Sequence, residues 1–357
     1  MSGRTVLRIT GDTPRRRGED RGRRAGDAIA RAWRVYDELF TTVGGRAPDV
    51  RSLALRTADA TRAWAPELVE EMEGVAEGAG LPFWTIAALN ARTEILAEAG
   101  APRAGECSTL VRTGPLTTGG QCWDWHEELA GSWHLQTVTG DAHGFAGITE
   151  HGILAKIGVN EAGVGVLFNI LGHTGDAATG VPVHLVARQV LGNAGSFAEA
   201  VGMLTGAPVS ASTVITVVTA DRAASVELAP AGSAVVVPDE RGWLTRTNHF
   251  LDPSLAAGEL RGRREPETYD RHRLLSRRVR AHPGPLGPDA LAALLSAHRE
   301  DGAEVCCHAP AGGALGSRWA TLATLAVDPA ERRLLVHDGG PCTAGPSTWT
   351  PLTAPAR

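Results

Sequence analysis

The chain has 357 residues, of which 43% are hydrophobic and 21% charged, so it can bury a full core and is not expected to be disordered. A formal net charge of −5 gives no general attraction to nucleic acid or anionic membranes, and neither is expected as a partner. The sequence shows neither a signal-peptide pattern nor an apolar stretch as long as a membrane helix. Five irregularly spaced cysteines argue against a disulfide framework and favour a reducing, cytoplasmic location.

The first hundred residues are expected to be helical. Six arginines fall within residues 15–24, interrupted by Glu19 and Asp20, and we interpret this run as a solvated helix start rather than a nucleic-acid arm. Segments 22–43 and 65–99 carry apolar residues at helical spacing, the second broken by Gly-Leu-Pro. Residues 99–106, AGAPRAGE, are small and predict an exposed linker.

After Cys107 the pattern changes to short β-like segments punctuated by glycine. Strands are expected within 107–113, 120–125, 133–140, 144–160, 162–171 and 212–250, with a closing hairpin at 319–340. Helices are expected at 183–192, near 196–204, and at 267–281 and 289–298. Two groups of strands with mainly antiparallel connections predict a layered α+β architecture rather than a doubly wound sheet.

Several common catalytic motifs are missing. The chain has no Gly-x-Ser-x-Gly and no His-Glu-x-x-His, and the segment GVGVLFN at 163–169 lacks the third glycine of a dinucleotide loop. Lys156 is the only lysine, and its surroundings fit neither a Schiff-base site nor a phosphate loop. These absences argue against a serine nucleophile elbow, a zinc protease and a nucleotide-binding enzyme.

The segment VCCHAP at 305–310 suggests a metal site. Adjacent cysteines chelate one metal poorly, and no Cys-x-x-Cys pair accompanies them. We therefore interpret Cys306 and Cys307 as small buried side chains and expect no metal site. A zinc-binding protein built on these two cysteines with His308 and His337 is the alternative.

Cys107 has different surroundings. It follows the linker at the boundary between helical and β-rich sequence, with the hydroxyls of Ser108 and Thr109 beside it. Asp124 lies between two tryptophans, an unfavourable place for a carboxylate without a partner. The segment RTNHF at 246–250 puts Asn248 at the end of an expected strand, where site residues often project.

At these residues the chain resembles the isopenicillin N acyltransferase family of N-terminal-nucleophile hydrolases. The resemblance extends through most of the chain and rests on the order of GVAEGAGL, LNARTE, ECST, CWDW, KIGVNEAGVGVLFNIL, GVPVHLVAR, TNHF, VCCHAP and TLATLAVDPAERRLLVHDGGPC. It implies a four-layer αββα sandwich of two antiparallel sheets. It also implies a precursor that cuts itself before its nucleophilic cysteine, here between Glu106 and Cys107. Residues 1–106 would become a small subunit and residues 107–357 a large one, and the two would stay associated.

The resemblance assigns catalytic roles. Cys107 would be the nucleophile and its freed amine the base, because an α-amine titrates near ~8 and a thiol near ~8.5. Asp124 would hold that amine, and Asn248 would donate a hydrogen bond to the developing oxyanion. Arg318 matches the family's late arginine near the site.

A second set of residues is expected around the nucleophile. Ser108, Thr109 and Asn169 are candidates for contact with substrate, whereas Asn160 and Glu161 match a family turn and are interpreted as mainly structural. The expected reaction is hydrolysis or transfer at an N-acyl bond of a small molecule through a thioester on the cysteine. No cofactor is expected, although a coenzyme A thioester is a candidate acyl donor.

The chain departs from the family pattern near the expected site. Cys122 stands where the family usually has asparagine, and this substitution supports an alternative function, a non-catalytic relative that binds an acylated ligand. Ser108 and Thr109 follow the nucleophile in the reverse of the family's order, which we interpret as a mild change. Glu106 precedes the nucleophile where the penicillin enzyme has glycine, which argues against penicillin as the substrate.

Overall fold

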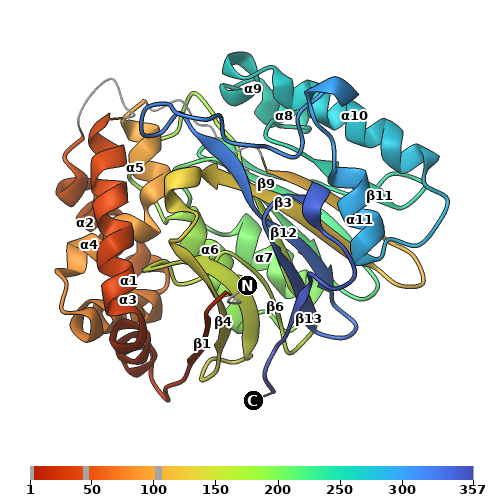
Figure 1. Ribbon diagram of the computed structural model, residues 1–357. Coiled ribbons are helices and arrows are strands. Elements are labelled where there is room, and N and C mark those ends of the chain that lie inside the picture. Colours follow the sequence, from red (N-terminus) through yellow and green to blue (C-terminus); the bar gives the residue numbers. More distant parts are fainter. Residues whose placement is uncertain (1–3, 43–47, 101–106, 357) are drawn as a thin grey trace.

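The computed structural model describes residues 4–42, 48–100 and 107–356, so Glu106 and most of the expected linker lie outside the described residues. The first part of the chain is helical, as expected, and its helices stand together at one side of the molecule (Figure 1, red to orange). They are α1 (Pro14–Thr42), α2 (Val50–Trp64), α3 (Pro66–Ala79), α4 (Phe83–Asn90) and α5 (Arg92–Glu98).

One strand in this region was not expected. The strand β1 (Val6–Ile9) precedes the helices and pairs in parallel with β4 (Trp133–Val138). Four residues with alternating burial are too few to establish a period, so no local pattern indicated this strand. The segment expected to become the small subunit therefore contributes an edge strand to a sheet.

Two sheets form the centre of the molecule. The larger has the order β1-β4-β5-β6-β7-β8-β9-β10 and the smaller β11-β2-β3-β12-β13-β14. Apart from β1 with β4, all neighbouring strands are antiparallel. The remaining strands are β2 (Ser108–Arg112), β3 (Thr118–His126), β5 (Phe145–Glu150), β6 (Ile157–Asn160), β7 (Gly165–Ile170), β8 (Thr213–Val218), β9 (Ala223–Ala229), β10 (Gly232–Val236), β11 (Trp243–Arg246), β12 (Trp319–Asp328), β13 (Arg333–Asp338) and β14 (Thr350–Thr353).

Helices cover the outer faces of both sheets, which confirms the expected αββα sandwich (Figure 1). Helices α6 (Val183–Asn193) and α7 (Phe197–Thr205) pack on the eight-stranded sheet. Helices α10 (Glu267–Ala281) and α11 (Pro288–Leu295) pack on the six-stranded sheet. The shorter elements are α8 (Pro253–Ala256), α9 (Arg261–Arg264), η1 (Glu127–Leu129), η2 (Arg299–Asp301) and η3 (Pro341–Thr343).

The alternation of side chains along β2 positions the residues next to Cys107. Val111 packs in the main core with residues of the other sheet, whereas Leu110 packs with Leu274 and Leu291 of the covering helices. Successive side chains of a strand point to opposite faces. Odd positions of β2 therefore face the space between the sheets, and even positions face α10 and α11.

Helices α1 and α3 approach each other closely through glycines. A Cβ atom at Gly18 would overlap the carbonyl oxygen of Glu71, and one at Gly74 would overlap the carbonyl oxygen of Arg15. Side chains at these positions would push the two helices apart. This close approach brings the polar residues of α1 and α3 within reach of the sheet.

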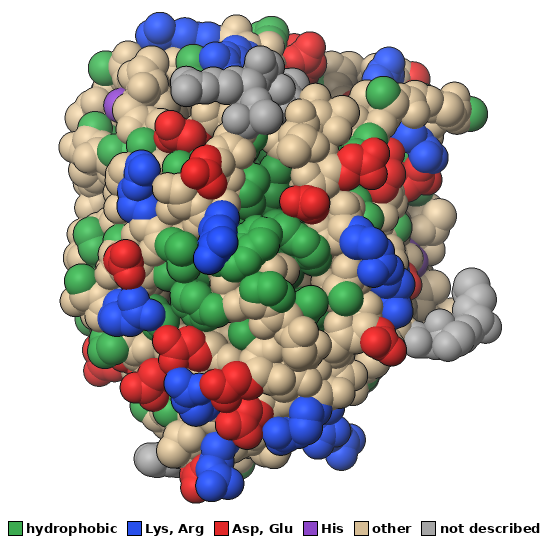
Figure 2. Space-filling model, turned by 90° about the vertical axis from the view of Figure 1, so that its left-hand side faces the viewer, with side chains coloured by type: hydrophobic (Ala, Val, Ile, Leu, Met, Phe, Trp, Pro, Cys, Tyr) green, Lys and Arg blue, Asp and Glu red, His purple; other side chains and the backbone are tan. Residues whose placement is uncertain are grey.

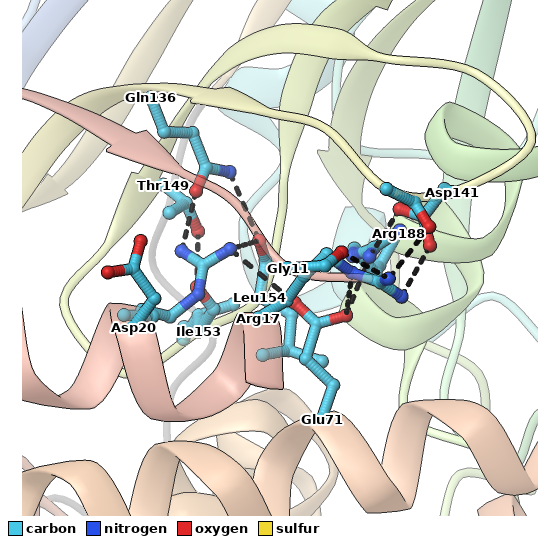
Figure 3. A network of polar contacts seen from close by, with 12 residues as sticks. Gly11, Arg17, Asp20, Glu71, Gln136, Asp141, Thr149, Ile153, Leu154 and Arg188 are labelled. Carbon is cyan, nitrogen blue, oxygen red and sulfur yellow. Dashed lines mark hydrogen bonds and ion pairs between the residues drawn. The ribbon is translucent and has the colours of Figure 1, made fainter. Parts of the chain in front are cut away.

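The arginine run of α1 is only partly solvated, which corrects the sequence interpretation. Arg17 and Arg21 are 3% and 0% exposed and belong to a buried network with Glu71, Asp141 and Arg188, which we call the outer network (Figure 3). Arg188 lies 2.6 Å from both carboxylates, and Arg17 lies 2.6 Å from Asp141. Charge alternation along the sequence could not reveal these partners, because two of them come from beyond residue 107.

Among the described helices, none combines the length and apolar character needed to cross a bilayer. On the face formed by the N-terminal helices, hydrophobic side chains gather between charged ones (Figure 2). Partly buried aromatic residues of this layer pack on the core, and Trp33 meets Trp84 edge to face with ring centroids 5.2 Å apart.

Candidate active site

Cys107 lies immediately before β2, on the side where the two sheets face each other, and is 4% exposed. Burial raises the pKa of its thiol, and the charge of Asp124 raises it further. Lys156, a hydrogen bond involving the backbone of Asp124, and Arg261 act in the opposite direction. A buried thiol of this kind is protonated at neutral pH and needs a nearby base to become a nucleophile.

The backbone carbonyl of Cys107 is fixed by side chains from two different elements. Asn169 of β7 donates its Nδ2 hydrogen to this oxygen over 2.8 Å, and Thr109 donates to Asn169 Oδ1 over 2.8 Å. Both were candidates for contact with substrate, and their hydrogen bonds join β2 to the opposite sheet. They orient the residue that precedes β2.

Arg271 is a site residue that the sequence motifs did not reveal. It projects from α10, is 1% exposed, and donates to Ser108 Oγ over 3.0 Å and to the carbonyl oxygen of Cys107 over 3.4 Å. It also donates to Asn248 Oδ1 over 3.1 Å. The spacing of the helix gave one indication. Arg271 lies three residues after Thr268 and four before Leu275, so helical periodicity places all three on the buried face of α10.

The amide of Asn248 has a defined orientation. Its Oδ1 accepts from Arg271, which can only donate, so Nδ2 points the other way. One Nδ2 hydrogen is donated to the carbonyl oxygen of Ile170 over 2.8 Å. Hydrogen bonds among the described residues leave the second hydrogen for another acceptor. A fixed amide donor near a thiol is the arrangement that stabilises an oxyanion.

Asp124 is held in the middle of the six-stranded sheet. It is 1% exposed, and its strand β3 pairs with β2 on one side and with β12 on the other, opposite Thr321. The register pairs Ser108 with Cys122, so Asp124 lies two residues further along, beside the end of β2 at which Cys107 stands. A carboxylate there can hold a positively charged group at the start of β2.

A second buried polar network, which we call the site network, lies between the sheets and comprises Tyr36, Arg92, Glu150 and Lys156. Glu150 accepts from Arg92 over 2.8 Å and from Lys156 over 3.1 Å, and it also bonds the Tyr36 hydroxyl. Burial alone would raise the pKa of Glu150, but Arg92 and Lys156 together hold it well below its usual range. Its carboxylate is therefore charged at every physiological pH.

Lys156 is the member of this network that connects it to Cys107. Burial lowers its pKa to about 8, with Arg92 acting in the same direction and Glu150 against it. Its Nζ lies 4.0 Å from the centroid of the Trp123 ring, and the charges of Lys156 and Cys107 each affect the pKa of the other. The sequence around this lysine argued against a Schiff-base site and a phosphate loop. It did not predict that the lysine would affect the pKa of a buried thiol, because Cys107 belongs to a distant segment.

Arg318 and the expected family turn lie in different surroundings. Arg318 forms an ion pair with Glu127, and its side chain is 30% exposed. Asn160 caps its own turn, because Oδ1 accepts from the backbone N–H groups of Ala162 and Val164. Glu161 lies 3.4 Å from His143. The structural interpretation of Asn160 therefore holds, and the contacts of Arg318 give it no direct link to Cys107 among the described residues.

The departure at Cys122 has a structural explanation. Its side chain is fully buried in an apolar cluster with Leu110 and Trp243, beneath α10 and α11. Burial raises the pKa of this thiol well above its usual value. A small apolar thiol suits that cluster, so this position gives the non-catalytic alternative no specific support.

A hollow of about 580 Å³ opens between the start of α10 and the loop that leads to β12. Glu265, Glu267, Asp270 and Glu304 line it together with Arg299, so negative charge predominates. Arg261 pairs over 2.9 Å with Glu265, which lines the hollow, and its charge also lowers the pKa of Cys107. It has room for a small molecule and favours a positively charged group.

The zinc set considered from the sequence does not assemble. Cys307 donates to the carbonyl oxygen of Trp319 over 3.3 Å, and His337 bonds Thr343 over 3.0 Å. Cys306 and His308 do come together, but with other partners, His298 and Cys342. Among the described residues this is the one group of histidine, cysteine or acidic side chains arranged to hold a metal ion.

The fold is the one expected of an N-terminal-nucleophile enzyme family, and comparison with known proteins identifies the family. Residues 113–341 match the family model described as acyl-coenzyme A:6-aminopenicillanic acid acyl-transferase. This range is more than half of the chain, and the chain belongs to that family. The acyl-coenzyme A:6-aminopenicillanic-acid-acyltransferase 40 kDa form of Emericella nidulans is 32% identical over 211 residues, 58% of this chain and 58% of that protein. The chain thus matches less than two thirds of that relative's length.

Solved structures with a similar arrangement have low sequence identity. The Caenorhabditis elegans ortholog of N-acylethanolamine-hydrolyzing acid amidase has a TM-score of 0.46 at 15% identity, covering 62% of this chain and 93% of that one. Penicillin V acylase from Agrobacterium tumefaciens has a TM-score of 0.44 at 15% identity, covering 65% of this chain and 83% of that one.

Proposed function

We propose that this protein is a self-processing enzyme that hydrolyses or transfers the acyl group of a small N-acylated molecule, with Cys107 as its nucleophile. The observation that carries the proposal is the arrangement around Cys107. Asn169 and Arg271 fix its carbonyl, the same Arg271 orients the Asn248 amide, and Asp124 lies beside it. Membership of an acyltransferase family supports the reaction class.

Self-cleavage frees the α-amine of Cys107, which then serves as the base. The Cys107 thiol attacks the Glu106 carbonyl, the Glu106–Cys107 C–N bond breaks, and a thioester joins Glu106 to the sulfur. The thiol proton passes to the released amine of Cys107. Water then opens the thioester, which leaves a carboxylate on Glu106 and restores the thiol. Residue 107 now carries a free amine that titrates near physiological pH.

The same groups then act on substrate. The Cys107 amine accepts the thiol proton, and the sulfur attacks the substrate carbonyl. The remaining Nδ2 hydrogen of Asn248 is donated to the oxyanion, and Asp124 holds the protonated amine. The C–N bond of the substrate breaks, the leaving amine takes the proton, and the acyl group stays on sulfur as a thioester. Water or a second amine then accepts it.

Lys156 supports the thiolate electrostatically in this scheme. Its positive charge opposes the effect of burial on the Cys107 thiol. Because the pKa of Lys156 is about 8, this support weakens as the pH rises above that value. The acidic hollow beside Arg261 suits the amine half of a substrate, and a coenzyme A thioester remains a candidate acyl donor.

The two cleaved chains would stay associated through buried contacts. Arg17, Arg21 and Glu71 of the N-terminal segment meet Asp141 and Arg188 of the core in the outer network. In the site network Tyr36 and Arg92 meet Glu150. The parallel pairing of β1 with β4 adds a third connection.

The test begins with intact mass under denaturing conditions for the wild type, Cys107→Ala and Cys307→Ser. We expect two fragments that meet at Glu106 and Cys107 in the wild type and in Cys307→Ser, and one chain in Cys107→Ala. An uncut, fully active wild type, or a cut Cys107→Ala, would contradict the mechanism. Cys307 is the matched control because it is a cysteine bonded to a backbone carbonyl.

A second measurement tests turnover separately from processing. An activated acyl ester should add one acyl mass to the large fragment, at Cys107. Asn248→Ala should form this acyl-enzyme ~10²–10³ times more slowly, because one oxyanion donor is lost. A cut protein that no acyl donor labels would support the alternative of a ligand-binding relative.

A further inference from the structure

Four side chains from three separate segments converge on one point at the outer side of the six-stranded sheet. They are His298, Cys306, His308 and Cys342, which we call the Cys2His2 cluster, and their ligand atoms all lie within 4.8 Å of one another. Cys306 is buried, His298 is half-buried, and His308 and Cys342 are exposed. The group is therefore anchored in the core on one side and reachable from solvent on the other.

We propose that the Cys2His2 cluster is a structural zinc site. The two sulfurs lie 3.5 Å apart, and each lies 3.5 Å from His308 Nε2. The Nε2 atoms of His298 and His308 are 3.2 Å apart. Tetrahedral ligands at ordinary Zn–S and Zn–N lengths of about 2.3 and 2.0 Å have separations of about 3.3–3.8 Å. Four of the six separations in the cluster are close to these values before any ion is considered, and the two from His298 to the sulfurs are no longer than 4.8 Å.

The surrounding backbone holds the ligands in this arrangement. The N–H groups of Val305 and Cys306 both donate to the carbonyl oxygen of Ala297, the neighbour of His298, over 2.9 Å. Cys342 lies in the single turn η3, and a Cβ at Gly340 would come within 2.7 Å of Cys306 Sγ. A glycine is therefore required where the third segment passes over the buried sulfur.

Neither a disulfide nor hydrogen bonding accounts for the whole cluster. A disulfide between Cys306 and Cys342 would require the sulfurs to approach from 3.5 Å to about 2.05 Å, and it would give the two imidazoles no role. Hydrogen bonds alone do not explain why two thiols and two imidazoles all point at one centre. Two thiolates, formed when the thiols lose their protons, and two neutral imidazoles are a typical zinc ligand set.

The chemistry of the set indicates the role of the metal. Four protein ligands complete a tetrahedron, so no position remains for water or substrate, and the site is structural rather than catalytic. The ion would tie the loop 305–308 to His298 at the start of η2 and to Cys342 of η3. That loop bonds the sheet beside the site, because Thr321 exchanges hydrogen bonds with the backbone of Cys307 over 2.9 Å and lies opposite Asp124.

The zinc alternative considered from the sequence included Cys306 and His308 but missed His298 and Cys342, because the four ligands follow an unusual spacing. Seven residues separate His298 from Cys306, one separates Cys306 from His308, and thirty-three separate His308 from Cys342. The adjacent pair Cys306 and Cys307 argued against a metal, but Cys307 points elsewhere. The fourth ligand only joins the others after β12 and β13 have formed their hairpin.

Metal analysis of the full chain tests the proposal directly. Protein purified under reducing conditions without chelators or a histidine tag, then given zinc and dialysed, should hold about one zinc per chain. Cys342→Ser and His308→Gln should lower the affinity at least ~10-fold. Cys307→Ser, the neighbouring-cysteine control, should keep its zinc. Substoichiometric zinc in the wild type, or equal binding by wild type and the Cys342→Ser variant, would overturn the proposal.

A test without substitutions covers variants that do not fold. Cys342 is exposed and would react readily with iodoacetamide as a free thiol. Bound zinc should protect it, and a strong chelator should restore alkylation, as read by peptide mass spectrometry. Cobalt(II) in place of zinc should give the absorption of a tetrahedral thiolate complex. Equal alkylation with and without the chelator, or cobalt spectra that lack thiolate absorption, would show that no metal binds here.

Discussion

The outer network and the site network are both buried, and both join residues 1–106 to the rest of the chain. The outer network uses three arginines and two carboxylates. The site network uses one arginine, one lysine, one carboxylate and one phenol. Guanidinium groups keep their charge in proteins, whereas a buried ammonium changes its charge easily. The same burial therefore gives a fixed connection in one place and a titratable group beside a thiol in the other.

The largest expected effect comes from removing the carboxylate at the centre of the outer network. Glu71→Gln leaves Arg17 and Arg188 paired with Asp141 and takes from Arg21 its ion pair with Glu71, and breaking a buried ion pair typically costs about 3–5 kcal/mol. Denaturant unfolding in the uncut Cys107→Ala background measures the change. Glu73→Gln, at a partly exposed ion pair of the same helix, is the control and should cost less than about 1 kcal/mol. Equal losses of unfolding free energy in Glu71→Gln and Glu73→Gln would show that the buried network stabilises the fold no more than a surface ion pair.

The second-largest expected effect is a difference between the two networks in how the free energy of unfolding depends on pH. The folded pKa of Lys156 is about 8, below its unfolded value of 10.5. Between these values the unfolded chain holds a proton that the folded chain has released, so the stability contributed by this group rises with pH. The full gain is about 3 kcal/mol. Below pH 8 both states are protonated, and this contribution is absent.

Comparing the wild type with Lys156→Met isolates that contribution. Unfolding measured from pH 7 to pH 10.5 should show a positive slope in the wild type relative to the variant. Arg188, whose pKa is raised rather than lowered despite its burial, supplies no such slope in this range. Burial lowers the pKa of Arg21 to about 10, but Arg21 is present in both proteins, so its contribution cancels in the comparison. A wild type and Lys156→Met with parallel profiles would show that the lysine does not titrate in the folded protein.

A smaller effect is expected on the reactivity of Cys107. Lys156→Met removes a positive charge that lowers the pKa of the thiol, and each unit of pKa changes the thiolate fraction about tenfold below the pKa. Alkylation of Cys107 at neutral pH should therefore be slower in Lys156→Met than in the wild type. Arg188→Met in the outer network should leave the rate per folded molecule unchanged. A similar slowing in both variants would indicate general loosening of the fold.

The smallest effect is expected at the phenol of the site network. Tyr36 accepts a hydrogen bond from Trp125 Nε1 over 2.8 Å and bonds Glu150. Tyr36→Phe removes the hydroxyl but keeps the ring, so we expect a loss of about 1–2 kcal/mol in unfolding free energy. Self-cleavage should continue, since Arg92 and Lys156 still hold the carboxylate. Complete loss of cleavage would give Tyr36 a catalytic role that the contacts do not suggest.

Much of the architecture was predictable because it depends on local patterns. Helical periodicity placed α1 and α10, and alternating short segments placed most strands of both sheets. The exceptions are two short edge strands, β1, whose partner lies more than a hundred residues away, and β14, which follows the last expected hairpin. Cys107, Asp124 and Asn248 were found because each belongs to a short motif of the family. Their catalytic roles remain proposals that the processing experiment tests.

The sequence by itself determined the layered α+β class, the candidate nucleophile and its family, since these depend on residues close together in the chain. The tertiary structure decided which distant side chains surround that nucleophile. Arg271 lies 164 positions from Cys107, and Lys156 affects the pKa of the Cys107 thiol only because the fold buries both side chains in the same region. The Cys2His2 cluster likewise forms only after the hairpin of β12 and β13 brings Cys342 back to Cys306. The positions of these residues along the sequence do not predict such contacts, because burial and sheet register, rather than local periodicity, bring the groups together.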